Sequence, residues 1–464
     1  MTDHPDLTPC ASGASGASGV LAGIDGELRR ILVLRALVLG DTMCAVPALR
    51  AIRRAWPRAH IALMGLPVAR DYLSRLDCVD EWLPFPGWPG LPERPVDVRQ
   101  LPAFLTAMQA SDWDLAIQLH GSGELTNPLL ALLGARHNAG FHGPGAWVPP
   151  EDAGRFAPWP MLGHETQRLL SLCRHLGLPV EDDALEFPLR DEDEVVLRHA
   201  WPGRDRAGPA TRADHDPGNR DGNRDGDGDG DGQQAGEGGY ACLHVGAQLP
   251  SRRWPLRRFA AVGQALHDAG LTVVLSGTAG ERAMTGELSA MLGAVGVPCV
   301  DLAGATTLWS LGALLRGARV LVCNDTGVSH IAAALRVPSV VVSCGSEPMR
   351  WAPSDRTLHR VLAKPAPCRP CAYAECPNGH ACAHALSVLE VLQALDDLLR
   401  PPHVGLGAVG SDAGATSRSS SSPSPSPSPD ASPAPKEGTH VSPPAHPDVA
   451  RPRQLPVQPH AGAA

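Results

Sequence analysis

The sequence predicts an α/β protein with two doubly wound domains, each built on a parallel sheet. Short apolar runs typical of buried strands alternate with amphipathic helical runs along residues 29–200 and again along residues 240–400. A hydrophilic stretch at residues 201–239 separates the two series. Many of the strands end in loops of Gly, Ser, Thr and Asp, and parallel sheets bind ligands at those ends. We therefore expect a site in a cleft between the two domains.

Composition narrows the class of protein. The chain has 464 residues, of which 43% are apolar, and this is enough for two cores. A net charge of −9 excludes a global basic field that would attract nucleic acid. Most of the twelve cysteines are isolated in apolar runs, which is typical of buried free thiols. Because we find neither a long uncharged apolar run nor a signal-peptide pattern, we expect a cytoplasmic protein with at most peripheral membrane contact.

Three segments have compositions that cannot build a core. Residues 1–28 contain the repeat ASGASGASG, residues 201–239 contain NRDGNRDGDGDGDGQQ, and residues 401–464 are rich in Ser, Pro and Ala. We predict a leader, a linker and a tail. The Asp-Gly run lacks the bidentate Glu of an EF-hand and the apolar residues of a calcium β-roll, so no calcium site is predicted there.

The first domain is expected to begin with a strand at residues 30–34, followed by a loop that ends in Gly40-Asp41. The helix after this loop carries arginines on one side, at positions 50, 53, 54 and 58. They form either a solvated face or a surface for an anionic acceptor. Further strands are expected at residues 61–64, 79–83 and 114–119, with helices at 68–76 and 126–133. The segment PFPGWPGLPERP, residues 84–95, is expected to be irregular.

The second domain contains the most distinctive stretch of the chain, a β-α-β unit at residues 320–343. Its first turn is Asn324-Asp325-Thr326-Gly327, where the N-terminus of a helix offers unpaired N–H groups and suits a phosphate. The alternative is that these residues only cap and bend the chain. The other strands are expected at residues 241–245, 272–276 and 299–302, with helices at 256–269, 308–315 and 385–399 and one that ends near residue 292.

The full string NDTGVSHIAAA, residues 324–334, resembles the donor-nucleotide signature of the ADP-heptose:lipopolysaccharide heptosyltransferases, glycosyltransferase family 9. Four other segments support the resemblance: LGDTMCAVPALRAIRRAWP, HVGAQLPSRRWP, SGTAGE and PCRPCAYAECPNGHAC. It spans about residues 29–399 apart from the linker. The resemblance implies the GT-B architecture, two facing Rossmann-like domains, with the acceptor on the first domain and the nucleotide sugar on the second.

The resemblance also implies roles for two residues on facing loops. Asp41 matches the family's proposed general base, which takes the proton of the acceptor hydroxyl. The alternative is that Asp41 only caps its helix. Arg252 stands where the family usually has Lys in a K-x-W-P pattern, and so matches the clamp on the diphosphate. Arg presents a planar fork rather than a compact ammonium, so the donor geometry is open, and the alternative is an exposed loop charge.

The remaining implied site residues belong to the second domain. Asp325, Thr326, Gly327 and His330 match positions around the diphosphate and the sugar, and Glu281 matches the acid that contacts the ribose. A satisfied core histidine is the alternative for His330. No metal or other cofactor is expected. A cysteine cluster lies near the end of this domain, at positions 368, 371, 376 and 382, with a histidine at 380. Its second pair lacks the standard spacing of a zinc site, so we interpret the cluster as a feature shared with some members of the family, which does not establish zinc binding.

Taken with the resemblance, the sequence predicts an inverting, metal-independent glycosyltransferase. It is expected to move a heptose from ADP-L-glycero-D-manno-heptose to the inner core of lipopolysaccharide at the inner face of the cytoplasmic membrane. The alternatives are a GT-B enzyme for another sugar or acceptor, a nucleotide-sugar-binding protein without transfer, and an isomerase such as a nucleotide-sugar 2-epimerase. The expected acceptor loops, residues 84–95 and 120–124, carry no signature that identifies the acceptor.

Overall fold

The computed structural model of the chain describes residues 27–204 and 238–400. All of them belong to one compact unit. The predicted leader (1–28), linker (201–239) and tail (401–464) lie almost entirely outside the described residues, and the boundaries of the two domains stay predictions. In the described part of the chain, no helix is both long enough and apolar enough to cross a membrane.

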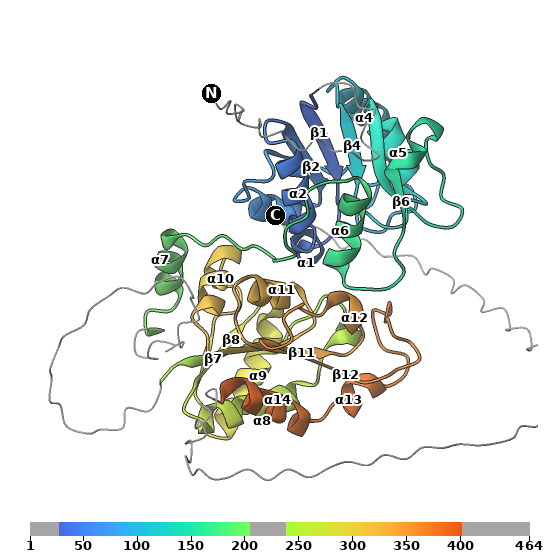
Figure 1. Cartoon of the computed structure of the whole chain (residues 1–464). Coiled ribbons are helices and arrows are strands. Elements are labelled where there is room, and N and C mark those ends of the chain that lie inside the picture. Colours follow the sequence, from blue (N-terminus) through green and yellow to red (C-terminus); the bar gives the residue numbers. More distant parts are fainter. Residues whose placement is uncertain (1–26, 205–237, 401–464) are drawn as a thin grey trace, which may run out of the picture. The chain divides into compact units, whose positions relative to one another are not determined.

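The first half forms a six-stranded parallel sheet with the strand order β3-β2-β1-β4-β5-β6 (Figure 1). In the central register, Leu32 of β1 lies between Ala62 of β2 and Ala116 of β4. The order reverses between β1 and β4, so the loops that follow these two strands diverge and leave a crevice for a ligand. The strands are β1 (Arg30–Leu34), β2 (His60–Gly65), β3 (Glu81–Pro84), β4 (Leu115–Gln118), β5 (His137–His142) and β6 (Phe156–Pro158).

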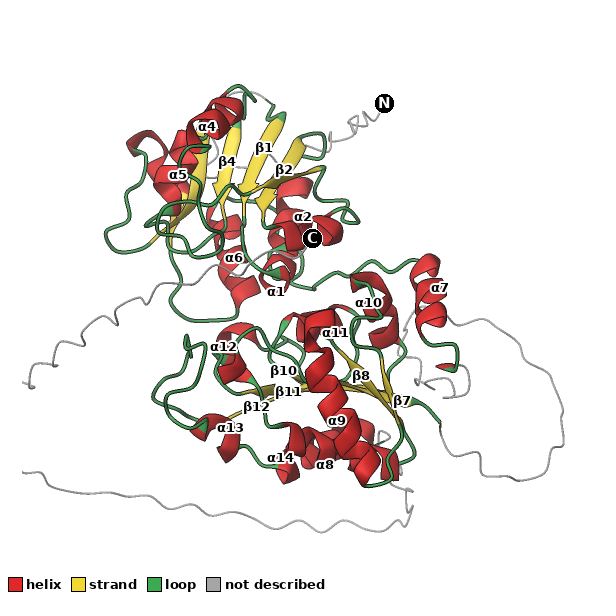
Figure 2. Ribbon diagram, turned by 180° about the vertical axis from the view of Figure 1, so that it is seen from behind, coloured by secondary structure: helices red, strands yellow, loops and turns green. Residues whose placement is uncertain are grey.

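Helices cover both faces of this sheet (Figure 2). Ile31 and Val33 of β1 share a core with α2 and α6, whereas Leu32 and Leu34 share a core with α4 and α5. Neighbouring side chains of a strand point to opposite faces, so a strand covered on both sides is apolar throughout, as predicted for β1. The helices are α1 (Leu39–Met43), α2 (Val46–Ala55), α3 (Pro67–Leu73), α4 (Leu101–Gln109), α5 (Thr126–Leu132), α6 (Glu165–His175), α7 (Asp191–Ala200) and the 3-10 helix η1 (Pro150–Arg155).

The second half repeats the same winding, with the strand order β12-β11-β10-β7-β8-β9 and parallel pairing throughout. Its reversal lies between β7 and β10. Leu243 of β7 shares a core with α8, α9 and α14, whereas Cys242 faces the core that contains α10 and α11. The strands are β7 (Tyr240–His244), β8 (Thr272–Ser276), β9 (Cys299–Asp301), β10 (Val320–Asn324), β11 (Ser339–Ser343) and β12 (His359–Ala363).

Most helices of the second half begin after a loop that follows a strand, whereas α14 follows α13. They are α8 (Leu256–Asp268), α9 (Arg282–Ala294), α10 (Leu308–Arg316), α11 (Gly327–Ala334), α12 (Pro348–Trp351), α13 (Ala381–Ala385) and α14 (Val388–Leu399), with the 3-10 helices η3 (Pro250–Arg252) and η4 (Ala279–Glu281). Helix α7 packs against α10 (Figure 1). There Arg316 donates to Glu194 at 2.8 Å, and a Cβ on Gly312 would lie 2.3 Å from the Phe187 ring, so only glycine fits at 312.

The prediction that Gly40-Asp41 ends a loop is wrong. Both residues lie inside α1, a short helix that precedes α2. The chain leaves the helical ladder after Met43 because Pro47 has no N–H to donate back to it, whereas proline is well suited to the first turn of a new helix. Asp41 is therefore in the first turn of α1 rather than ahead of a single long helix.

The helix predicted at residues 385–399 is present as α14, but it begins three residues later, at Val388. The structure has α13 and α14 on either side of a break, and Ser387 caps α14. The Ser387 hydroxyl accepts from Glu390 N at 3.3 Å, and the Glu390 carboxylate accepts from Ser387 N at 2.9 Å. This capping box satisfies N–H groups that a helix start leaves unpaired.

The sequence did not predict strands β5, β6 and β12, because none of them contains a long apolar run.

The cap of α14 yields a test with a defined pH dependence. Ser387→Ala is expected to lower the free energy of unfolding by about 1 kcal/mol, measured by urea denaturation. Hydrogen bonds from Lys364 and Ser387 lower the pKa of the Glu390 carboxyl to about 2. The charged carboxylate therefore stabilises the fold above its unfolded pKa of about 4.3, and this stabilisation is lost as the pH falls toward 2. The stability difference between wild type and Glu390→Gln should shrink over that range, and a constant difference would contradict the assignment.

Candidate functional site

Two adjoining cavities lie at the carboxyl ends of the central strands. The smaller, about 340 Å³, is lined by the loops that follow β7, β8 and β10. Leu39 of α1 also lines the smaller cavity. The larger, about 640 Å³, adds Gly40 and Asp41 of α1 and residues of α12. Gln248, Thr326 and Gly327 line both cavities, so the two form one continuous region. Cavities of this size accommodate a small-molecule ligand such as a nucleotide.

All seven predicted site residues line these cavities. The larger is lined by Asp41, Arg252, Asp325, Thr326, Gly327 and His330, and the smaller by Glu281 together with Thr326 and Gly327. They come from segments far apart in the sequence that meet because each segment follows the carboxyl end of a parallel strand. Their proximity agrees with the sequence analysis, while their chemical roles stay a proposal.

Asn324 closes β10 and joins two loops of the smaller cavity. Its Oδ1 accepts from the Trp254 backbone N–H at 2.9 Å, and its Nδ2 donates to the Val245 carbonyl at 2.7 Å. The side chain is fully buried. Asn324 therefore has a structural task, which is to hold the segment after β7 beside the start of α11.

Thr326 precedes α11 but does not cap it with its side chain. Its hydroxyl is buried and has no hydrogen-bond partner among the described residues, although it lines both cavities. A buried hydroxyl without a partner is unfavourable, so this one is available to a ligand. Asp325, next to it, accepts a hydrogen bond from the Ser346 hydroxyl. Side-chain capping, the alternative open from the sequence, does not describe Thr326.

Arg252 is held by the cysteine-rich segment, so it is not a free loop charge. Its Nη2 donates to the Cys371 carbonyl at 2.6 Å, and its Nε is buried and has no hydrogen-bond partner in the described part of the chain. The neighbouring Ser251 donates its hydroxyl to the Tyr373 carbonyl at 2.5 Å and its N–H to the Ala374 carbonyl at 3.2 Å. The guanidinium is thus positioned at the wall of the larger cavity.

The same cysteine-rich segment also supports Asp325. Arg369 donates to the Ser343 carbonyl at 2.9 Å and to the Ser346 carbonyl, and Ser346 in turn donates to Asp325. One segment therefore positions both predicted donor residues of this wall, Arg252 and Asp325. Its four cysteines are free thiols. Among the described residues, no group of three or more His, Cys, Asp or Glu side chains is arranged to hold a metal ion.

Glu281 has a structural contact that the sequence analysis did not consider. Its Oε2 accepts from the N–H and the hydroxyl of Thr278 at 2.7 and 2.9 Å, which forms a capping box. A Cβ on Gly246 would lie 1.7 Å from Oε1, so any larger residue there would displace the carboxylate. Because Thr278 holds Oε2, Oε1 is the oxygen left for a ligand in the smaller cavity.

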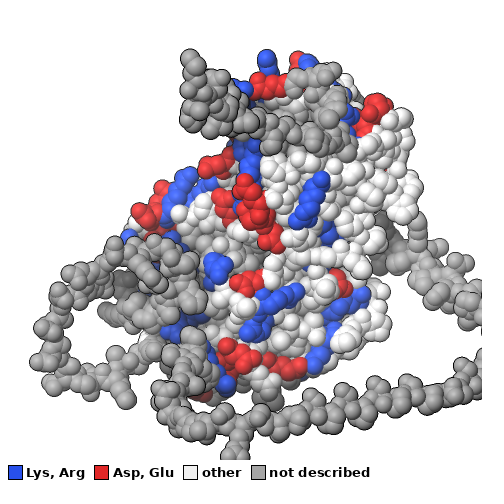
Figure 3. Space-filling model, in the orientation of Figure 1, with Lys and Arg blue, Asp and Glu red and all other residues white. Residues whose placement is uncertain are grey.

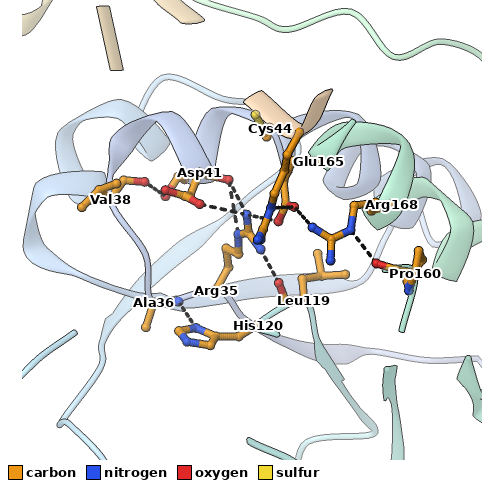
Figure 4. Close-up of polar contacts among 12 residues, drawn as sticks. Arg35, Ala36, Val38, Asp41, Cys44, Leu119, His120, Pro160, Glu165 and Arg168 are labelled. Atoms are coloured by element: carbon orange, nitrogen blue, oxygen red, sulfur yellow. Dashed lines mark hydrogen bonds and ion pairs between the residues drawn. The ribbon is translucent and has the colours of Figure 1, made fainter. Parts of the chain in front are cut away.

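Asp41 lies beside a buried arginine that the sequence analysis missed (Figure 4). Arg35 follows β1 and has no exposed surface. Its Nη1 donates to the Leu119 carbonyl at 2.6 Å, and its Nε and Nη2 donate to the Asp41 carbonyl at 3.2 and 3.0 Å. The Asp41 carboxylate itself lies 3.7 Å from Arg35 Nη2. Val38, not Asp41, is the N-cap of α1, so the capping alternative does not hold for Asp41.

Glu165, the first residue of α6, supplies the counter-charge to this arginine. Its Oε1 lies 3.0 Å from Arg35 Nη2, and its Oε2 accepts from Arg168 Nη1 at 3.0 Å and from Arg350 Nε at 2.8 Å. Burial alone would raise the pKa of Glu165, but these guanidinium groups, with Arg35 first, outweigh it and lower the pKa to about 2. Glu165 is therefore ionised at neutral pH.

The electrostatic environment of Asp41 differs from that of Glu165. Burial raises the pKa of the Asp41 carboxyl, Arg35 opposes the rise, and the negative charge of Glu165 adds to it. The side chain keeps 17% of its surface exposed, so it remains accessible from the larger cavity. A carboxylate with a raised pKa is a better proton acceptor once ionised. The arrangement suits a general base.

His330 is buried, as expected for a core histidine, and it also lines the larger cavity, so its role toward a donor stays a proposal. Its Nδ1 lies 3.8 Å from Cys44 Sγ, and burial lowers its pKa, which keeps the ring neutral. A Cβ on Gly40 would lie 2.7 Å from the His330 ring. The glycine before Asp41 is thus required by the close approach of this histidine.

Nothing local in the sequence indicates Glu165, Arg168 or Arg350, because tertiary structure alone brings them to Arg35. Arg35 itself could have been found, since a charged residue directly after a buried strand has to be paired.

The arginines of the α2 region have carboxylate partners, which favours a solvated, ion-paired face over an acceptor surface. The pairs are Arg50 with Asp182, Arg53 with Asp80, Arg54 with Glu181 and Arg58 with Glu27. Figure 3 shows basic and acidic side chains interspersed on the face drawn.

Residues 103–382, more than half of the chain, match the sequence pattern of glycosyltransferase family 9 (heptosyltransferase). The chain belongs to this family. Lipopolysaccharide heptosyltransferase 2 of Escherichia coli is 25% identical over 337 residues, which cover 69% of this chain and 84% of that protein. Lipooligosaccharide heptosyltransferase 2 of Haemophilus influenzae is 32% identical over 116 residues, which cover 24% of this chain and 34% of that protein.

Solved structures confirm the fold of this family 9 chain. A family 9 glycosyl transferase from Veillonella parvula superposes with a TM-score of 0.58 at 17% identity, covering 80% of this chain and 97% of that one. The E. coli ADP-heptose lps heptosyltransferase II superposes with a TM-score of 0.54 at 20% identity, covering 80% and 98%. The two Rossmann-like sheets therefore form the GT-B architecture that the resemblance implied.

The buried charge cluster of this family 9 member predicts a large effect on stability. Glu165→Gln leaves the buried guanidinium of Arg35 with only the more distant Asp41 carboxylate, at 3.7 Å, as a counter-charge. We therefore expect a loss of about 3–5 kcal/mol in the free energy of unfolding, measured by urea denaturation. The matched control, Glu181→Gln, removes an exposed partner of Arg54 and should change stability by less than about 1 kcal/mol. Equal effects of the two substitutions would show that Glu165 is not the required counter-charge.

Proposed function

We propose that this protein is an inverting, metal-independent glycosyltransferase that moves a heptose from ADP-L-glycero-D-manno-heptose to the inner core of lipopolysaccharide. The observation that carries the proposal is one shared cavity. In a chain of the heptosyltransferase family, Asp41 of the first half lines the same cavity as Arg252 and Asp325 of the second half. A proton acceptor and groups suited to a sugar diphosphate thus face the same space.

The donor lies in the two joined cavities of the second half. The start of α11, with Gly327 and the unpartnered Thr326 hydroxyl, receives the diphosphate. Arg252, which lines the same cavity, neutralises its negative charge. Glu281 accepts from ribose hydroxyls through Oε1, and neutral His330 donates to an oxygen of the donor.

The reaction is a single displacement at the anomeric carbon. Asp41 takes the proton of the acceptor hydroxyl while its oxygen forms the new bond to that carbon from the face opposite the diphosphate. The bond between the sugar and the diphosphate breaks, and its electron pair leaves with ADP. Arg252 and the N-terminus of α11 stabilise that negative charge, so the proposed mechanism needs no metal ion. One displacement inverts the anomeric configuration.

The acceptor approaches from the first half, where Asp41 lies. We propose that the enzyme works in the cytoplasm, in peripheral contact with the inner face of the cytoplasmic membrane, where the growing lipopolysaccharide core is presented. One observation supports a variant of this proposal. Because Arg252 replaces the lysine usual in the family, a donor with a different sugar is the second candidate, on the same fold and with the same base.

The proposal is tested by mass-spectrometric detection of heptose transfer from ADP-heptose to a panel of truncated lipopolysaccharide cores. Wild type should transfer the sugar equally well with and without a metal chelator. Asp41→Asn keeps the size of the side chain but removes the base, and should slow transfer by about 10²-fold or more. Asp71→Asn, at an exposed position of α3, is the matched control and should remain active.

Three outcomes would contradict the proposal. Full activity of Asp41→Asn would exclude that residue as the base. Conversion of the donor without any acceptor would indicate an isomerase. Binding of ADP-heptose without transfer to any core would support the nucleotide site alone. It would mean either that the acceptor is not lipopolysaccharide or that the protein is not a catalyst.

A further inference from the structure

His244, the last residue of β7, lines the smaller cavity but has no part in the mechanism proposed above. It ends a strand whose other residues pack into the cores, and it begins the segment that leads to Arg252. The residue is buried, with 8% of its surface exposed, and it shares the cavity wall with Glu281 and Thr326. A buried imidazole is unfavourable unless both ring nitrogens have partners. The partners of the two nitrogens therefore decide what His244 does.

The first ring nitrogen, Nδ1, is held by a residue of the neighbouring strand. In the parallel register of β7 and β8, His244 lies opposite Ser276. The Ser276 hydroxyl lies 3.1 Å from His244 Nδ1 and 3.3 Å from Cys242 Sγ. Cys242 is two residues before His244 and therefore on the same face of β7. All three residues are buried, so this chain of hydrogen bonds lies inside the protein.

The chemistry of the three groups sets the direction of these hydrogen bonds. Burial raises the pKa of the Cys242 thiol to about 12, so Cys242 stays protonated and donates to the Ser276 oxygen. A sulfur atom is a weak acceptor, whereas an imidazole nitrogen is a good one, so the Ser276 hydroxyl donates to His244 Nδ1. Burial lowers the pKa of His244, which keeps the ring neutral. Because Nδ1 is the acceptor, the single ring proton is on Nε2.

The second ring nitrogen, Nε2, is available to a ligand. It has no hydrogen-bond partner among the described residues, and it is not one of their sealed polar atoms. Glu281 lines the same cavity, and its negative charge opposes the effect of burial on the pKa of His244. Its Oε1 lies against Gly246, two residues after His244, where a Cβ would be only 1.7 Å away. A donor, Nε2–H, and an acceptor, Oε1, therefore belong to one small cavity.

We propose that His244 Nε2–H donates a hydrogen bond to a ribose hydroxyl oxygen of the nucleotide, next to the hydroxyl that Glu281 Oε1 accepts from. A sugar hydroxyl donates and accepts at the same time, so a paired donor and acceptor match a vicinal diol. A phosphate would satisfy His244 but would be repelled by Glu281. Ser276 and Cys242 act through His244, as positioning residues. The inference rests on the proposed nucleotide site and adds residues that select ribose over deoxyribose.

The test measures the affinities of ADP, 2′-deoxy-ADP and 3′-deoxy-ADP by isothermal titration calorimetry on the full chain. His244→Phe keeps a planar ring but removes both nitrogens. Its affinity for ADP should fall about 5- to 10-fold, the effect of losing one neutral hydrogen bond. For the analogue that lacks the contacted hydroxyl, wild type and His244→Phe should agree within about 2-fold, because neither complex contains that hydrogen bond.

A second buried Ser–His pair provides the matched control. His359 of β12 and Ser339 of β11 also lie opposite each other on parallel strands, with 2.8 Å between Nδ1 and Oγ. They are at the amino ends of their strands, and neither lines the two cavities. His359→Phe should therefore bind all three nucleotides as wild type does.

Two outcomes separate this inference from the proposed function. If His244→Phe weakens the binding of all three nucleotides equally, the loss does not come from a ribose contact. That result would overturn the inference and leave the proposed function intact. If wild type binds no ADP, the nucleotide site of the proposed function fails, and the inference fails with it.

Ser276→Ala tests the positioning role, because it removes the donor to Nδ1 and leaves His244 in place. The ring proton is then free to move to Nδ1, so the preference for ADP over the analogue should weaken. Nitrogen-15 NMR of histidine-labelled protein shows which ring nitrogen carries the proton, and the signal lost in His244→Phe identifies His244. We expect the proton on Nε2 in wild type and a mixture in Ser276→Ala. A wild-type proton on Nδ1 would overturn the inference.

Discussion

The guanidinium of Arg35, buried at the end of β1, is the constraint on which the first half of the site depends. It has no contact with solvent, so its charge and its donors must be matched inside the protein. Glu165 supplies the charge, while the carbonyls of Leu119 and Asp41 accept its remaining hydrogen bonds. This pairing ties the end of β4 and the start of α1 to the end of β1. As a result, Asp41 is held in one place, in an environment that raises its pKa.

In the second half, the ligand-facing loops are held mainly by hydrogen bonds between side chains and main-chain carbonyl or N–H groups. At its own reversal of strand order, between β7 and β10, the Asn324 amide joins the two loops. The cysteine-rich segment then holds the wall of the cavity, with the Cys371 carbonyl on Arg252 and Arg369 supporting Asp325 through Ser346. Rigid main-chain contacts therefore position the ligand-facing side chains before any ligand binds, which limits the entropy lost on binding.

Much of this architecture was predictable from the sequence, because buried parallel strands are continuous apolar runs and the ligand-facing residues follow directly after them. What was not predictable depends on distance along the chain or on short elements. Glu165 contacts Arg35 although the two are 130 residues apart in the sequence, and no local pattern indicates that contact. Helix α1 has only five residues, too few for a periodic pattern, so Asp41 was expected in a loop. The hydrogen bond between Ser276 and His244 likewise appears only when β7 and β8 are paired in register.

We propose that Asp41, made a stronger base by its burial, accepts the proton in sugar transfer. The most direct test is the pH dependence of the single-turnover transfer rate at saturating donor and acceptor, from pH 4 to 9. We predict that the wild-type rate falls on the acid side with an apparent pKa above the ordinary aspartate value of 3.8. The residual rate of Asp41→Asn should show no such fall. A wild-type rate that does not change across this range, or an acid limb that persists in Asp41→Asn, would exclude Asp41 as the base.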